Sequence, residues 1–143
     1  MIFLDANVIL RALTISDDPQ VRRASHAASD LFRLVHLGEA EVTTSDAILA
    51  EAAFILTAKS HYHVPAAEAA AKLAGLISLR GFRLPEKGAM LRALELWASA
   101  PQLGFVDALT ATYARAPGMQ LASFDADFDG IPGITRWNPS GAS

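Results

Sequence analysis

Apolar residues along this chain fall into two patterns, short continuous runs and longer stretches with helical spacing. The run Ile2–Leu4 is wholly apolar and the run Val42–Thr44 is β-branched, so each predicts a short strand, the first one buried. Weaker strand patterns follow at three places, Gly81–Leu84, Leu121–Phe124 and Ile134–Trp137. We therefore expect a small sheet whose strands are far apart in the sequence.

Between the predicted strands, apolar residues recur every three or four positions, the spacing of helices that bury one face. Pro19 and Pro65 suit the first turn of a helix, and Ser45 is a good N-terminal cap. These signals predict helices over residues 8–13, 20–37, 45–59, 66–79, 85–97 and 105–115. Because strands alternate with helices, we expect an α/β fold with a mostly parallel sheet. One domain would span residues 1–137, followed by a flexible tail, 138–143.

The composition narrows the class of protein. With 143 residues, 52% of them hydrophobic, the chain is long and apolar enough for one folded domain. It contains no cysteine, which excludes thiol nucleophiles, zinc ribbons, iron–sulfur clusters and disulfide frameworks. No apolar run reaches the roughly 18 residues that span a bilayer, and no basic leader precedes the first strand, so we expect a cytoplasmic protein. The net charge of −3 argues at first against a nucleic-acid partner.

Two aspartates stand where strands are predicted to end. Asp5 follows Ile2–Leu4, and Asp125 follows Leu121–Phe124. Because ligands of open parallel sheets bind beyond the carboxyl ends of the strands, we expect these two carboxylates at the same edge of the sheet. If the strands are neighbours, their backbones lie about 5 Å apart. Each aspartate could instead cap the helix or turn that follows it, but the occurrence of both favours a site.

Two further acids lie within predicted helices. Glu51 shares a helix face with Ile48 and Ile55, which predicts a partly buried carboxylate. The alternative is a glutamate at the margin of the apolar stripe that reaches water. Asp107 lies in the first turn of its helix, where the alternative role of an acid is to complement the helix dipole.

Four carboxylates that converged on one point would repel one another, and a divalent cation resolves this conflict. Mg²⁺ and Mn²⁺ prefer oxygen ligands. Such ions lower the pKa of a bound water and neutralise the charge that builds on a phosphoryl oxygen. A chain with these acids and without cysteine matches that chemistry.

Four segments together resemble the PIN domain, and most closely the VapC-type ribonuclease toxins of bacterial type II toxin–antitoxin pairs. The segments are Ile2–Leu10, Thr44–Glu51, Gly104–Leu109 and Ser123–Phe128. Their order and spacing in a chain of this size make the resemblance strong, and it covers nearly the whole chain. It implies a three-layer α/β/α sandwich around a parallel sheet, and the hydrolysis of an RNA phosphodiester by metal-activated water.

The resemblance also implies roles for individual residues. The acids that match its Mg²⁺ or Mn²⁺ ligands are Asp5, Glu51, Asp107 and Asp125. Asn7 and Ser123 match small polar residues that support these acids by hydrogen bonds, and Asp127 matches a further acid that can act through a water molecule. In one scheme Asp5, Asp107 and Asp125 hold one ion. Glu51 then either helps to hold a second ion or accepts the proton of the attacking water.

By the same resemblance the partners are an RNA substrate, a second copy in a homodimer, and an antitoxin whose helix docks in a hydrophobic groove. Arg11, Arg22 and Arg23 could contact RNA phosphates or an acidic tail of the partner, or form a solvated basic face. The motif His61-Tyr62-His63 is interpreted as a solvated loop rather than a metal pair, because no third ligand is in view.

The sequence leaves two alternatives to the nuclease function. The first is a PIN-like scaffold that binds RNA or protein without cutting, although such a scaffold would be expected to lack one or more of the acids. The second is a phosphatase of the haloacid dehalogenase type with Asp5 as the nucleophile. That mechanism requires a second aspartate two residues later, where this chain has Asn7.

Overall fold

The computed structural model describes residues 1–139, so most of the predicted tail, 138–143, lies outside the described residues. The helices are α1 (Ala6–Leu13), α2 (Pro19–Leu37), α3 (Asp46–Thr57), α4 (Ala66–Ile77), α5 (Lys87–Ser99) and α6 (Phe105–Ala114). The strands are β1 (Ile2–Phe3) and β2 (Val42–Thr43), and two 3₁₀ helices are η1 (Pro101–Leu103) and η2 (Ala126–Gly130). Each predicted helix is present, and its ends differ from the prediction by no more than two residues.

Local hydrogen bonds explain where the helices begin. The Asp18 carboxylate accepts a hydrogen bond from the N–H of Gln20 at 2.8 Å, and Pro19 fixes the first turn of α2. Ser45 accepts a hydrogen bond from the N–H of Ile48 at 3.2 Å and so caps α3, as predicted. These caps depend on neighbours in the sequence, which is why sequence reasoning located the helices well.

The strands β1 and β2 pair in parallel, with Ile2 opposite Val42 and Phe3 opposite Thr43. The α/β class and the parallel pairing are therefore confirmed, and the arrangement is consistent with a three-layer α/β/α fold. Within the described residues the sheet has only these two strands. The predicted third strand, 81–84, is reduced to a single parallel bridge between Phe82 and Val42.

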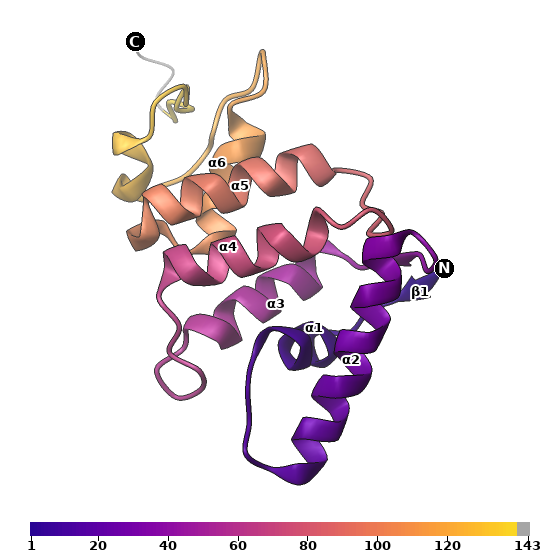
Figure 1. Ribbon diagram of the computed structural model, residues 1–143. Helices are drawn as coiled ribbons and strands as arrows, with labels where there is room; N and C mark the ends of the chain where they lie inside the picture. Colours follow the sequence, from indigo (N-terminus) through magenta and orange to yellow (C-terminus); the bar gives the residue numbers. More distant parts are fainter. Residues whose placement is uncertain (140–143) are drawn as a thin grey trace.

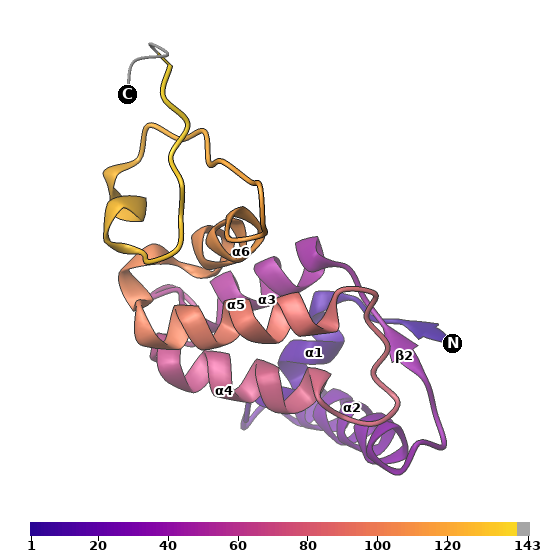
Figure 2. The same cartoon turned by 90° about the horizontal axis from the view of Figure 1, so that it is seen from above.

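The two strands predicted near the C-terminus do not join this sheet. Leu121 and Arg136 form one isolated parallel bridge with each other instead. The reason is a second, smaller hydrophobic core, which holds this part of the chain against η1 and α6. Its buried members are Ala100, Leu103, Ala111, Ala114, Leu121, Phe128 and Ile131. Figures 1 and 2 both show this C-terminal segment next to α6 and at the opposite end of the molecule from β1.

The expectation that residues 2–4 form a buried strand is wrong for two of the three. Ile2 is 45% exposed and Phe3 is 63% exposed, whereas Leu4 is 1% exposed. Within the described chain, β1 has a strand neighbour on one side only, so its other edge and its side chains stay open to solvent.

The main core lies where α1 to α6 meet the sheet. Its fully buried side chains include Ile9, Val35, Leu56, Ile77 and Phe82. The rings of Phe32 on α2 and Phe82 stack at 6.5 Å between centroids, which links this helix to the loop after α4. Figure 1 shows α4 lying beside α5, with α3 beneath it. Among the described helices, none combines the length and the apolar character needed to span a membrane.

Candidate functional site

Asp5 lies where the chain leaves β1 and enters α1. Its carboxylate accepts a hydrogen bond from the N–H of Ala6 at 2.8 Å, so it caps the helix. Leu4 is buried in the core directly before it, while Asp5 itself is exposed. The chain thus anchors this carboxylate at the end of a strand and leaves it accessible to solvent.

Glu51 is exposed on α3, and the expectation that it is partly buried is wrong. The core-facing stripe of α3 is Leu49, Ala52, Ala53 and Leu56. Glu51 lies two residues after Leu49, about 200° around the helix, and therefore on the opposite side. Ile48 and Ile55 lie at the margins of the buried stripe and are only half-buried.

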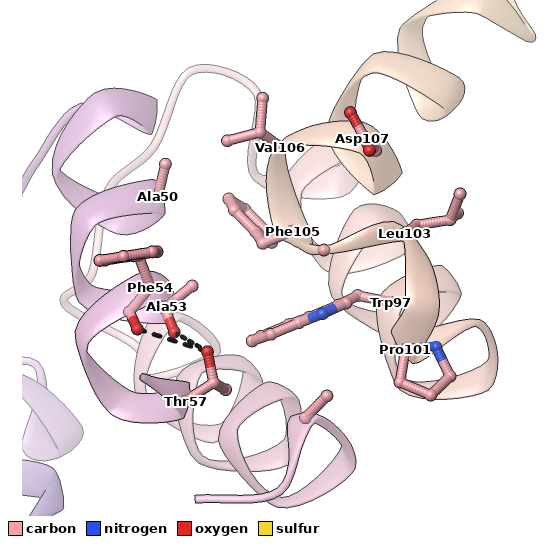
Figure 3. Close-up of a pocket in the computed structure, with 12 residues that line it drawn as sticks. Ala50, Ala53, Phe54, Thr57, Trp97, Pro101, Leu103, Phe105, Val106 and Asp107 are labelled. Carbon is pink, nitrogen blue, oxygen red and sulfur yellow. Dashed lines mark hydrogen bonds between the residues drawn. The ribbon is translucent and has the colours of Figure 1, made fainter. Parts of the chain in front are cut away.

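Asp107 lies in the first turn of α6 and is half-buried at the rim of a cavity. Gly104 turns the chain from η1 into α6 with φ +77° and ψ 162°, a conformation that is essentially restricted to glycine. The cavity has a volume of about 340 Å³ and lies between α3 and the start of α6. Figure 3 shows Phe54 on α3 and Trp97 on α5 among its walls, with Asp107 at its edge.

Asp125 and Asp127 lie on the C-terminal segment, where both are exposed. The carboxylate of Asp125 accepts a hydrogen bond from the N–H of Asp127 at 2.9 Å and caps η2. Ser123 accepts a hydrogen bond from the N–H of Asp125 at 3.0 Å, so it positions the backbone of this acid rather than its carboxylate. Arg136 donates hydrogen bonds to the Ser123 carbonyl and to the Asp129 carboxylate, both at 2.6 Å. These bonds join the end of the C-terminal segment to the residues around Asp125.

The structure brings Asp107 into electrostatic contact with the two acids of the C-terminal segment. Burial raises the pKa of the Asp107 carboxyl, and the negative charges of Asp125 and Asp127 raise it further. Carboxylates that repel one another in this way form a natural position for a cation. These three acids are therefore the electrostatic centre of the candidate site.

The expectation that Asp5 and Asp125 follow strands of one sheet is wrong for Asp125 within the described residues. Leu121 packs in the second core with α6, and residues 121–124 do not pair with β1. Carboxylate oxygens suit Mg²⁺ or Mn²⁺ chemically. However, the described residues contain no group of three or more Asp, Glu or His side chains that could hold one ion. Asp107, Asp125 and Asp127 nevertheless lie close enough for their charges to interact.

The predicted supporting residue Asn7 and the predicted basic residues lie on α1 and α2. Asn7 and Arg11 line a groove of about 470 Å³ between these helices. Arg22 and Arg23 are exposed on α2 and do not line this groove. Arg11 donates a hydrogen bond to the Tyr62 hydroxyl at 2.9 Å. Sequence reasoning missed Tyr62 as a neighbour of α1, because the two residues are 51 positions apart and only the folded chain joins them.

Replacing Asp107 with asparagine is expected to stabilise the protein at neutral pH. The folded state raises the pKa of this carboxyl above its ordinary value of 3.8, so the folded protein binds the proton more tightly than the unfolded chain. The contribution of this group to the free energy of unfolding therefore falls as the pH rises from below 3.8. Asp107→Asn removes the unfavourable charge, and we expect the melting temperature at pH 7 to rise by about 1–3 °C.

The difference in melting temperature between Asp107→Asn and wild type should vanish near pH 3, because the wild-type carboxyl is protonated there in both the folded and the unfolded state. Thermal melts followed by circular dichroism at the two pH values measure the effect. Asp17→Asn is the matched control, because Asp17 is an exposed acid in the loop between α1 and α2. A lower melting temperature for Asp107→Asn at pH 7 would contradict the proposed repulsion.

The comparison with protein families gives one finding that covers most of the chain. The model of the PIN domain matches residues 2–134. No curated protein matches the sequence. PIN domains are generally nucleases, and they generally use divalent metal ions. Because the matched region includes every acid of the candidate site and all described helices, the chain belongs to the PIN domain family.

Proposed function

We propose that this protein is a Mg²⁺- or Mn²⁺-dependent endoribonuclease that acts as the toxin of a VapBC-type toxin–antitoxin pair. The observation that carries the proposal is the position of Asp107 at the rim of the cavity, where its burial and the nearby charges of Asp125 and Asp127 raise the pKa of its carboxyl. An RNA phosphate is an anion, and carboxylates repel it unless a cation lies between them. An acid at the rim of a cavity, with two further acids near it, in a family whose members are generally nucleases, therefore supports a site at which a cation and an RNA phosphate meet.

We assign Asp5 and Glu51 to the same reaction. Both carboxylates are exposed, so an RNA strand on this surface can reach them. Asp5 is also held in a fixed position by its hydrogen bond to the N–H of Ala6. The proposal requires these two acids to act together with the acids at the start of α6.

An antitoxin helix is the partner that we propose for the groove between α1 and α2. Its walls include Val8 and Leu31, and the small residues Ala24 and Ala27 leave room for an apolar ridge. Arg11 at the same groove provides a positive charge for an acidic side chain of the partner. Helix-in-groove recognition uses this combination of an apolar floor and polar ends.

We propose a homodimer on a different face, around the cavity of α3 and α6. The helix α3 is apolar on nearly every side, yet Phe54 is 69% exposed, and Val106 on α6 is 58% exposed. Exposed apolar residues that adjoin a hollow support an interface with another copy.

Expression in bacterial cells tests the proposed function. Wild-type protein is expected to arrest growth and to generate new RNA ends at defined positions, detected by sequencing of cleaved RNA. Asp107→Asn, whose folding the melting experiment checks, is expected to leave growth unchanged, because it removes one of the three acids at the start of α6. If wild type and variant are both harmless and no RNA is cut, the scaffold function replaces the nuclease.

A further inference from the structure

The loop between α3 and α4 has a defined backbone conformation, although its sequence contains no apolar anchor between residues 59 and 61. The carbonyl of Ala58 accepts hydrogen bonds from the N–H groups of His61 and His63, both at 3.0 Å. The N–H of Val64 donates to the carbonyl of Leu56 at 2.8 Å and brings the loop back against α3. His63 adopts φ +51°, the left-handed conformation that this tight turn requires. The loop thus holds its side chains in place before any ligand binds.

Four exposed side chains of this loop are basic or aromatic. Lys59, His61, Tyr62 and His63 are all exposed, and no acidic residue lies among residues 58–65. Arg11 joins them through its hydrogen bond to the Tyr62 hydroxyl. Within the described chain, neither Lys59 nor Arg11 forms an ion pair with a carboxylate. Their charges are therefore available to an anionic ligand.

This surface is continuous with the helices that carry two of the candidate acids. Asp5 caps the N-terminus of α1, and Arg11 lies in the last turn of the same helix. The helix α3 carries Glu51 and the exposed Phe54 before it runs into the loop. A strand bound along the loop would therefore pass the ring of Tyr62 and two cations, Lys59 and Arg11.

We propose that this loop binds single-stranded RNA, with a base stacked on Tyr62 and with Lys59 and Arg11 contacting phosphates. The inference rests on the proposed nuclease function and assigns the surface that holds the RNA strand. Exposed aromatic rings between cations are the features that bind single strands, because each base has a flat face for stacking and each phosphate has a charge. Bases paired in an A-form duplex do not expose these faces.

Fluorescence anisotropy with a labelled 12-nucleotide RNA tests the inference on the full-length protein. EDTA is present throughout, so that binding is measured without cleavage. Tyr62→Ala is expected to weaken binding of the single strand about 5- to 100-fold, the range for the loss of one stacked base. Tyr62→Phe retains the ring and should bind within about twofold of wild type. Tyr113→Ala is the matched control, because Tyr113 is similarly exposed on α6 but far from the loop.

The salt dependence of binding tests the phosphate contact separately. Lys59→Ala should reduce the slope of log Kd against log salt concentration by about 0.7, the value for one phosphate contact on a single strand. Arg92→Ala removes a charge from the exposed surface of α5 and should leave the slope unchanged. The same RNA annealed to its complement should bind more weakly than the single strand.

Two results would overturn the inference. One is equal binding of single-stranded RNA by wild type, Tyr62→Ala and Lys59→Ala. This result would favour a protein as the partner of the loop. The other is tighter binding of the duplex than of the single strand. A failure of the proposed nuclease function would be distinguishable from these results. In that case the protein would bind RNA in a manner that depends on Tyr62, but it would not cut RNA in the presence of Mn²⁺ or Mg²⁺.

Discussion

Asparagine at position 5 is expected to lower the rate of RNA cleavage by roughly a hundredfold or more while the fold stays intact. The substitution removes the negative charge that the proposed reaction needs. It retains a side-chain oxygen that can accept the hydrogen bond from the N–H of Ala6, and asparagine caps helices about as well as aspartate. Single-turnover cleavage of a labelled RNA in Mn²⁺ measures the loss, and circular dichroism confirms the fold.

Asp46→Asn is a closely matched control for this experiment. Asp46 is also exposed at the start of a helix, and its carboxylate accepts a hydrogen bond from the N–H of the next residue, Ala47, at 2.8 Å. It is not one of the candidate site acids, so Asp46→Asn should cleave RNA at the wild-type rate. Wild-type protein treated with EDTA should fall to the rate of Asp5→Asn. Full activity in EDTA, or an equal loss in both variants, would remove the basis of the metal-dependent site.

The helices could be predicted from the sequence because their signals are local. Ser45 caps α3 through a bond to Ile48, three residues away, and Pro19 begins α2 where its fixed backbone angle is favourable. The sheet could not be predicted to the same degree. Its strands are two residues long, and the pairing of Val42 with Ile2 is set by contacts across 40 residues. The segment after α6 has the apolar sequence of a strand, but the burial of Leu121 against α6 decides its position.

In the candidate site, too, features set by neighbouring residues could be predicted, whereas features set by tertiary packing could not. Sequence reasoning correctly located Asp5 at a strand end and Asp107 in the first turn of a helix. It chose the wrong face for Glu51, because α3 is apolar on nearly every side and its periodicity cannot distinguish one stripe from another. The proximity of Asp125 to Asp107 follows from how the C-terminal segment packs, which no spacing in the sequence reveals.

Alanine at position 81 is expected to destabilise the protein by about 2–4 kcal/mol, which lowers the melting temperature by roughly 6–15 °C. A Cβ atom at Gly81 would overlap the carbonyl oxygen of Ala40 and would lie 2.9 Å from that of Val35. Both atoms are backbone and cannot rotate away. The same glycine donates its N–H to the Val35 carbonyl at 2.8 Å and accepts from the N–H of Val42 at 2.9 Å, so any shift also strains β2.

Gly75→Ala provides the comparison that isolates this steric cause. Gly75 lies within α4, and a Cβ atom built there meets no other atom within 4 Å. Alanine restricts the unfolded chain and favours the helix, so this variant should be more stable than wild type by about 0.5–1 kcal/mol. Urea denaturation of the three proteins measures both changes. Equal stability of Gly81→Ala and Gly75→Ala would contradict the close approach of residues 35, 40 and 81. This approach holds β2 in place, and β2 in turn pairs with β1, the strand that precedes Asp5.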